Sequence, residues 1–139
     1  MIKSLLKIAV LFCLVGYLSA NVPIPKQLEE MTAGFRQQCV TDTGLNPDIL
    51  TKMDNGGDVS DDGAFKCYIK CIMNLIGAVS DKGIDLEKLV AVVPADVQQL
   101  AKDLLDKCKD IEAITDTCES SYQFVKCFHD NFPEKFFIV

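Results

Sequence analysis

Six cysteines between residues 39 and 127 constrain the fold of this chain more than any other feature. The gaps between them are 27, 3, 36, 9 and 8 residues: Cys39, Cys67, Cys71, Cys108, Cys118 and Cys127. An even set of cysteines in a short chain is typical of secreted domains, because the cytosol keeps thiols reduced. The pattern therefore predicts a small extracellular domain held together by three disulfides.

The spacing limits how these cysteines can pair but does not decide it. Cys67 and Cys71 lie one helical turn apart, which is a poor geometry for a disulfide within one helix. Cys118 and Cys127 are separated by roughly 13 Å along a helix, beyond the reach of a disulfide. Of the fifteen pairings that six cysteines allow, ten avoid both bonds and remain open. In each of them the helix around residue 70 is bonded through two cysteines, so it should be the centre of the framework.

The seventh cysteine, Cys13, lies in a segment with the order of a secretory signal peptide. Lys3 and Lys7 give a basic start, residues 8–18 are apolar, and Ser19-Ala20 is a small-residue cleavage site. The apolar stretch is too short and wrongly flanked for a membrane span. We therefore expect a leader that is removed from the mature protein.

The predicted boundaries are residues 1–20 for the signal peptide and residues 21–139 for one domain. The mature chain would carry 12 basic and 20 acidic side chains, a formal charge of −8. Binding to nucleic acid is not expected, because neutralising phosphates requires clustered Lys and Arg, and Arg36 is the only arginine.

Apolar residues recur at helical spacing along almost the whole mature chain, and no Asn-Gly turn separates two alternating strands. Asn46-Pro47 has the pattern of an N-cap followed by proline at the first helical position. Asp85 should cap a later helix, and Pro94 should separate that helix from the next. The sequence thus predicts one all-α domain of about six helices: one through Leu28, Met31, Phe35 and Cys39, then residues 48–52, 62–76, 86–93, 97–108 and 117–129.

The cysteine spacing resembles that of the insect odorant-binding proteins in their six-cysteine form. The gaps of three and eight residues are the most specific marks of that family, and the resemblance extends over residues 81–89 and the closing residues 136–139. It implies an all-α domain of about six helices around an apolar cavity. It also implies three interlocked disulfides, Cys39–Cys71, Cys67–Cys118 and Cys108–Cys127.

The resemblance further implies which residues bind the ligand. For any one of these apolar residues an ordinary place in the core is the better interpretation, so the prediction applies to the residues as a set. Three of them, Phe136, Phe137 and Ile138, would be exposed apolar residues at the end of the chain unless they cover the cavity. The predicted ligand-binding residues are Met73, Ile76, Leu86, Leu89, Val93, Val97, Leu100, Ala101, Leu104, Phe128, Phe136, Phe137 and Ile138.

Val139 would bring a carboxylate toward the core if the apolar residues before it are buried. A buried charge requires a partner. Arg36 and the hydroxyl of Tyr68 are expected to hold this carboxylate and keep the cover closed, an arrangement that we call the tail latch. The simpler alternative is that Arg36 is a solvated surface residue.

An enzyme is not expected, because a single histidine cannot be combined into a base–nucleophile pair of the triad type. His129-Asp130 lacks the calcium loop and the paired-cysteine motif of secreted phospholipases A2. Residues 58–63 imitate the start of an EF-hand loop, but Ile69 occupies the position of the bidentate carboxylate. These residues are better interpreted as a turn that caps a helix, and no metal or cofactor is expected.

These observations predict a carrier that transports a small apolar volatile or lipid-like ligand, such as an odorant or pheromone, through an extracellular fluid. It would act as a monomer or weak dimer in olfaction and could deliver its ligand to a membrane chemoreceptor. One alternative is a membrane-active protein like the saposins, although a charge of −8 disfavours anionic lipid. Another is the same carrier chemistry in a non-olfactory secretion.

Overall fold

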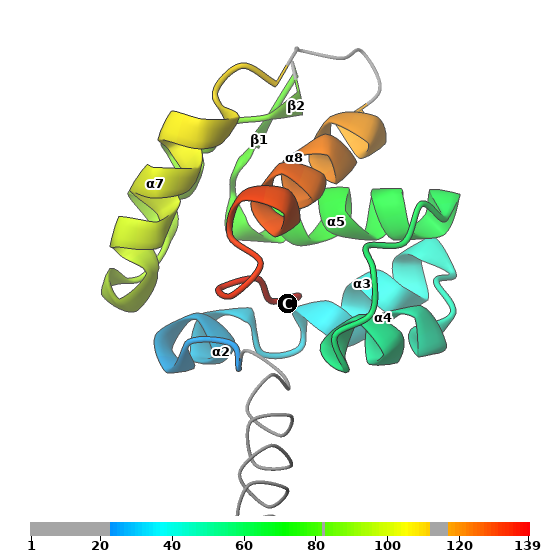
Figure 1. Ribbon diagram of the computed structural model, residues 1–139. Helices are drawn as coiled ribbons and strands as arrows, with labels where there is room; N and C mark the ends of the chain where they lie inside the picture. Colours follow the sequence, from blue (N-terminus) through cyan, green and yellow to red (C-terminus); the bar gives the residue numbers. More distant parts are fainter. Residues whose placement is uncertain (1–22, 82, 112–116) are drawn as a thin grey trace, which may run out of the picture.

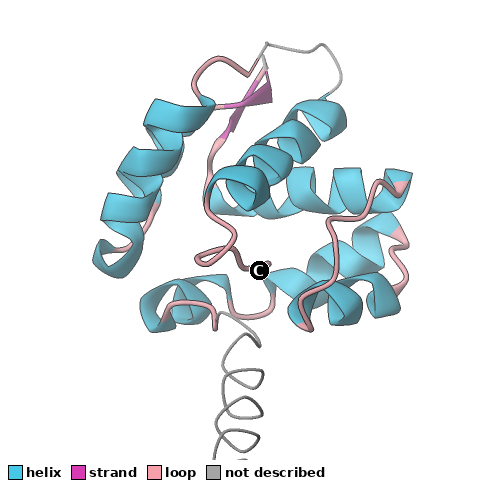
Figure 2. Cartoon of the chain, in the orientation of Figure 1, coloured by secondary structure: helices cyan, strands magenta, loops and turns pink. Residues whose placement is uncertain are grey.

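The computed structural model describes residues 23–81, 83–111 and 117–139 (Figures 1 and 2), so the predicted signal peptide lies outside the described residues. Within these ranges the chain forms seven α-helices, one 3₁₀ helix and one pair of short strands. In chain order they are α2 (Lys26–Thr32), α3 (Phe35–Thr43), α4 (Pro47–Asp54), α5 (Gly63–Ile76), β1 (Val79–Ser80), β2 (Gly83–Ile84), α6 (Leu86–Val92), η1 (Ala95–Val97), α7 (Gln98–Cys108) and α8 (Thr117–Asn131). The all-α prediction is confirmed.

Three helices begin where local side-chain chemistry predicts. The Asn46 side chain accepts a hydrogen bond from the Asp48 amide, with Pro47 in the first turn of α4. The Asp85 side chain accepts one from the amide of Lys88 at the start of α6. The EF-hand-like residues include Asp62, whose carboxylate accepts a hydrogen bond from the Phe65 amide and caps α5. These side chains satisfy amides that the first helical turn leaves without a partner.

The first predicted helix is in fact two helices, and this corrects the sequence-based expectation. The break falls at Gly34, whose φ of 85° is left-handed and cannot continue a right-handed helix. Leu28 on α2 and Cys39 on α3 are nevertheless both buried. The helical spacing of apolar residues therefore runs on from α2 into α3, and in the sequence only Gly34 indicates the turn between them.

The strand pair was not predicted either. Val79 pairs with Ile84 and Ser80 with Gly83 in antiparallel register. The amide of Ile84 also donates to the Ser120 hydroxyl on α8 at 3.3 Å. Two residues are too short for an alternating pattern to show, so the sequence carries no periodic signal for these strands.

Helix α5 is bonded through two cysteines, as predicted, but it is not the only centre of the framework, because α8 is bonded through two cysteines as well. Cys39–Cys71 joins it to α3 and Cys67–Cys118 joins it to α8, while Cys108–Cys127 joins α7 to α8. These are the three pairs that the family resemblance implied. In Figure 1 the last residues of the chain turn back from the end of α8 and finish among the helices, beside α3. We call residues 132–139 the tail.

Candidate ligand-binding site

A small apolar chamber lies between the tail and helices α2, α5, α6, α7 and α8. Its volume is about 70 Å³, and every residue in its wall is apolar. These residues come from segments far apart in the sequence, so the chamber exists only in the folded chain. Its wall is formed by Leu28, Ile76, Leu89, Val93, Val97, Leu100, Ala101, Leu104, Phe124, Phe128 and Phe137.

Nine of the thirteen predicted ligand-binding residues line this chamber. The other four lie elsewhere: Met73 is buried in the core, Leu86 lines a separate cleft beside Cys108, and Phe136 and Ile138 line an outer cleft described below. Phe136, Phe137 and Ile138 all line this outer cleft, and of the three only Phe137 lines the chamber as well.

Two chamber residues, Leu28 and Phe124, were absent from the predicted set. Both are buried, and both follow the apolar spacing of their helices. That spacing indicates burial but does not distinguish the wall of a chamber from ordinary core. The binding role of the wall residues stays a prediction.

The tail is fastened by aromatic contacts and, at the end of the chain, by a hydrogen bond. Phe128 on α8 packs edge-to-face against Phe136 and Phe137, with ring centroids 5.1 and 5.6 Å apart. The Tyr68 hydroxyl on α5 donates a hydrogen bond to the main-chain oxygen of Val139. Burial raises the pKa of Tyr68 far above its usual range, and the nearby Arg36 guanidinium opposes this only in part. The phenol therefore remains a protonated donor.

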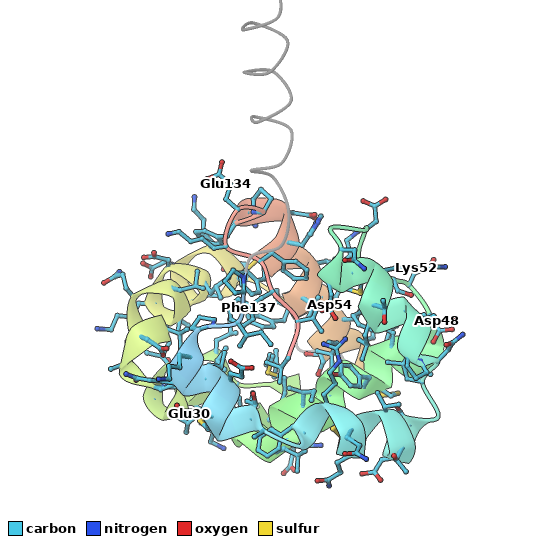
Figure 3. All side chains as sticks on the ribbon, turned by 90° about the horizontal axis from the view of Figure 1, so that it is seen from below. Glu30, Asp48, Lys52, Asp54, Glu134 and Phe137 are labelled. Atoms are coloured by element: carbon cyan, nitrogen blue, oxygen red, sulfur yellow. A yellow bond between two sulfur atoms is a disulfide. The ribbon has the colours of Figure 1, made fainter. Side chains whose placement is uncertain are left out.

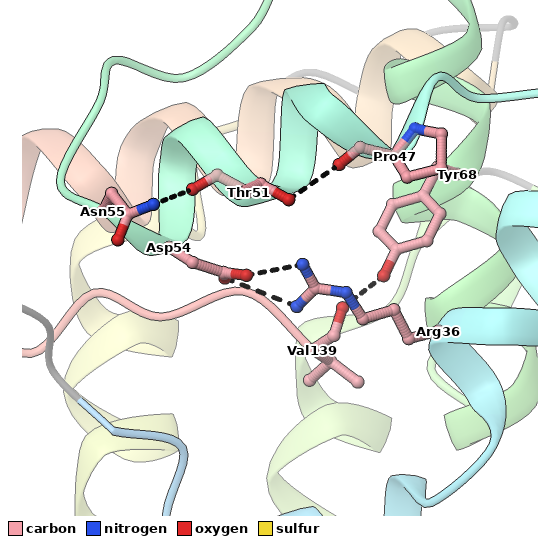
Figure 4. Close-up of polar contacts among 7 residues, drawn as sticks. All are labelled: Arg36, Pro47, Thr51, Asp54, Asn55, Tyr68 and Val139. Atoms are coloured by element: carbon pink, nitrogen blue, oxygen red, sulfur yellow. Dashed lines mark hydrogen bonds and ion pairs between the residues drawn. The ribbon is translucent and has the colours of Figure 1, made fainter.

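Arg36 makes a different contact from the one predicted for the tail latch. Its two terminal nitrogens, Nη2 and Nη1, lie 2.5 and 3.3 Å from the carboxylate oxygens of Asp54, the last residue of α4 (Figure 4). Helices α3 and α4 lie side by side in Figure 1, which brings this carboxylate within reach of the guanidinium. A planar guanidinium fits a carboxylate in this forked geometry. Arg36 is thus paired with Asp54, and the hydrogen bond to Val139 comes from Tyr68.

A larger outer cleft of about 510 Å³ also has Phe137 in its wall. Unlike the chamber, it has charged and titratable side chains in its wall: Arg36, Asp54 and His129. The imidazole of His129 packs against the Phe136 ring at 5.0 Å and lies 3.3 Å from the Asp130 carboxylate. The remaining wall residues are Pro23, Ile24, Met53, Gly56, Gly57, Pro133, Phe136, Phe137 and Ile138.

Phe137 also borders a third cavity of about 320 Å³, formed with Pro25, Asp96, Asp103 and their neighbours on the α7 side of the tail. One aromatic side chain therefore belongs to the walls of the inner chamber and of two outer clefts. Figure 3 shows Phe137 toward the middle of the ring of helices, with Asp54 nearer its edge. Movement of this ring would open the chamber toward a neighbouring cleft.

Other kinds of site find little support in the part of the chain that the structure describes. Among those residues, no three or more His, Cys, Asp or Glu side chains are grouped so as to hold a metal ion. The helices described include none with the length and apolar character needed to cross a membrane.

Comparisons with known proteins agree with the all-α fold. The chain is 27% identical over 109 residues to general odorant-binding protein 69a of Drosophila melanogaster, covering 78% of this chain and 70% of that protein. The structure resembles that of an odorant-binding protein from Locusta migratoria, with a TM-score of 0.69, 30% identity, and coverage of 82% of this chain and 88% of that one.

A further similar structure is odorant-binding protein 7 of Anopheles gambiae, which has four disulfide bridges and holds an azo compound. Its TM-score is 0.66 and its identity 30%, over 81% of this chain and 91% of that one. The sequence model of the PBP/GOBP family matches residues 22–131 of this chain. The protein therefore belongs to the PBP/GOBP family.

Proposed function

We propose that the protein carries a small apolar ligand in the inner chamber and releases it when the tail moves. The observation that carries this proposal is a chamber with an entirely apolar wall, part of which is supplied by the tail. Apolar walls with few polar groups are typical of small-molecule sites. Relatives named as odorant-binding proteins, one of them holding an azo compound, support the same role.

The size of the chamber indicates that binding requires movement. Small-molecule sites commonly have volumes of roughly 300–1,000 Å³, whereas this chamber has about 70 Å³. Among its wall residues, Phe137 alone comes from the tail, and every other wall side chain belongs to a helix or its cap. We infer that Phe137 and its neighbours swing away to admit a ligand and then cover it.

The chemistry of the wall sets an expected affinity and specificity. Burying apolar area contributes about 25 cal/mol per Å², so micromolar affinity is reachable for a ligand of about 10–20 heavy atoms. A hydrophobic wall distinguishes one methylene by only about 1–3 kcal/mol. The carrier should therefore accept a series of related apolar compounds.

The proposed setting is an extracellular fluid, in keeping with the leader predicted in residues 1–20 and with three disulfides. Delivery to a membrane chemoreceptor in olfaction is the finer proposal, and tissue expression would distinguish it from the same chemistry in another secretion. The family match does not favour the saposin-like alternative. Leakage of dye from anionic vesicles on adding the protein would support that alternative instead.

Displacement of an apolar fluorescent probe tests the proposed function. We expect the mature protein to bind the probe with micromolar affinity and to release it to long-chain alcohols, esters and aldehydes. A chain ending at Lys135 lacks the cover and should hold the same probe more weakly and exchange it faster. If no apolar compound displaces the probe, the carrier proposal is wrong.

A further inference from the structure

The outer cleft differs from the chamber in carrying charge. Among its described wall residues, Arg36, Asp54 and His129 are the side chains that are charged or can titrate. The chamber beside it offers apolar side chains alone. Because Phe137 is a wall residue of both, the two cavities adjoin at this ring.

This arrangement gives the two ends of a ligand different surroundings. The chamber holds about 70 Å³, too little for a chain of ten carbons, so even an enlarged chamber places the far end of such a ligand near Phe137. The outer cleft beyond that ring has about 510 Å³ of space. A long-chain ligand that enters past Phe137 from this side would therefore leave its polar end in the outer cleft.

The charges of the outer cleft are already paired. Both terminal nitrogens of Arg36 contact Asp54, at 2.5 and 3.3 Å (Figure 4). An anionic head group has to displace the Asp54 carboxylate or lie beside it, and like charges in contact are unfavourable. A neutral hydroxyl or carbonyl meets no such repulsion. Arg36 has five N–H donors, more than one carboxylate uses, and Asp54 has acceptor capacity left for a hydroxyl.

We propose that the outer cleft is a subsite for the polar end of the ligand and that its Arg36–Asp54 pair selects neutral amphiphiles, namely alcohols, aldehydes and esters, over carboxylates of the same chain length. This inference rests on the carrier function proposed above. It names the class of ligand and assigns the selectivity to one side chain, Asp54.

Competition between decan-1-ol and decanoate for the probe tests the selectivity. The measurement is made at pH 8, where the fatty acid is ionised. A carboxylate is better hydrated than an alcohol in any case, so the wild-type ratio of affinities is only the baseline. The decisive variant is Asp54→Asn, which keeps the size of the side chain and frees the guanidinium of Arg36.

We expect Asp54→Asn to shift the ratio of the two affinities toward decanoate by about tenfold, the size of one close charge interaction near a protein surface. Arg36→Gln should shift it the other way, because it leaves Asp54 without its partner. Asp103→Asn is the matched control: it removes the same charge from the cleft on the α7 side of the tail and should leave the ratio unchanged. Circular dichroism establishes that each variant is folded.

The outcomes separate this inference from the function on which it rests. If decan-1-ol and decanoate both fail to displace the probe, the carrier function itself is wrong. If decan-1-ol binds but Asp54→Asn leaves the ratio unchanged, the subsite is wrong and the carrier function stands. An equal shift in Asp54→Asn and Asp103→Asn would show a general effect of net charge and would also overturn the subsite.

Discussion

The hydroxyl of Tyr68 donates a hydrogen bond to the main-chain oxygen of Val139, 71 positions further along the chain. Tyr68 lies on α5, between the two cysteines that bond this helix to α3 and α8. The tail is thus fastened to a helix that two disulfides hold in place. This contact fixes the end of the tail, and the rings of Phe136 and Phe137 are fixed separately against Phe128.

Tyr68→Phe should loosen the tail without changing the shape of the buried ring. We expect the free energy of unfolding to fall by about 1–2 kcal/mol, because the Val139 oxygen loses its partner. Release of a bound probe should become faster, which stopped-flow displacement would measure. Tyr122→Phe is the control, since Tyr122 lies on α8 with Lys66 over its ring. If both variants release the probe at the wild-type rate, the hydrogen bond does not hold the cover.

Phe128→Ala should change both stability and ligand preference. Phe128 is buried, lines the chamber and contacts both aromatic residues of the tail. Truncating such a ring in a core costs about 3–5 kcal/mol, which chemical denaturation would measure. The cavity that it leaves should alter probe affinity by about 1–3 kcal/mol and favour bulkier ligands. A variant with normal stability and an unchanged ligand series would show that the ring is not part of the site.

The disulfide framework can be checked by mapping peptides without reduction. We expect three cross-linked peptides and no thiol that reacts with an alkylating reagent in the mature protein. Replacing Cys108 and Cys127 together by alanine should lower the free energy of unfolding by about 2–5 kcal/mol, mainly because the unfolded chain gains freedom. Recovery of a peptide with Cys67 bonded to Cys71 would contradict the framework.

Sequence reasoning predicted those parts of the fold that depend on local chemistry. Asn46, Asp62 and Asp85 each cap a helix through their own side chains, and such caps are visible in a few neighbouring residues. The disulfide pairs came from the family resemblance, because the spacing alone left ten possibilities. Most of the chamber wall was predicted on the same basis.

The features that could not be predicted depend mostly on how segments far apart in the sequence pack together. The partner of Arg36 is decided by the packing of α4 beside α3, and nothing local to Arg36 points to Asp54, 18 positions further along the chain. The volume of the chamber depends on how far the tail enters it, which no periodic pattern records. The break between α2 and α3 was visible only as Gly34, and glycine alone does not prove a left-handed turn.

That break gives a direct test with a matched control. Gly34 has a φ of 85°, where a side chain is strained even though a Cβ would meet no other atom within 4 Å. Gly34→Ala should therefore lower the free energy of unfolding by about 1–2 kcal/mol. Gly63→Ala, also in open space but at the start of α5 with an ordinary backbone, should be neutral or slightly stabilising. Equal effects of the two substitutions would show that the left-handed turn is not strained.

Lys66 on α5 and Glu119 on α8 form an ion pair, in which Nζ of Lys66 lies 2.7 Å from Oε2 of Glu119. The hydrogen bond from Lys66 lowers the pKa of Glu119, and the same bond raises the pKa of Lys66. Lys66 also lies over the Tyr122 ring at 4.5 Å. The pair therefore links the two central helices beside the Cys67–Cys118 disulfide.

The direction of the pH dependence follows from these shifts. The pKa of Glu119 is lower in the folded than in the unfolded chain, so its carboxylate stabilises the fold fully at pH values above its ordinary pKa of 4.5. This contribution disappears as the pH falls through the lower pKa of the folded chain. The pKa of Lys66 is raised in the folded chain, so Lys66 stabilises the fold fully at pH values below its ordinary pKa of 10.5. This contribution disappears as the pH rises through the higher pKa of the folded chain.

We therefore expect Glu119→Gln to unfold at a lower temperature than wild type by a constant amount between pH 6 and 9. The difference should shrink below about pH 4.5 and above about pH 10.5, where the wild type loses the pair as well. Thermal unfolding followed by circular dichroism across this range measures it. Glu30→Gln, an exposed site on α2, changes the net charge equally and should show no such profile. A difference between wild type and Glu119→Gln that persists undiminished at pH 3 would mean that Glu119 stabilises the fold through something other than its charge.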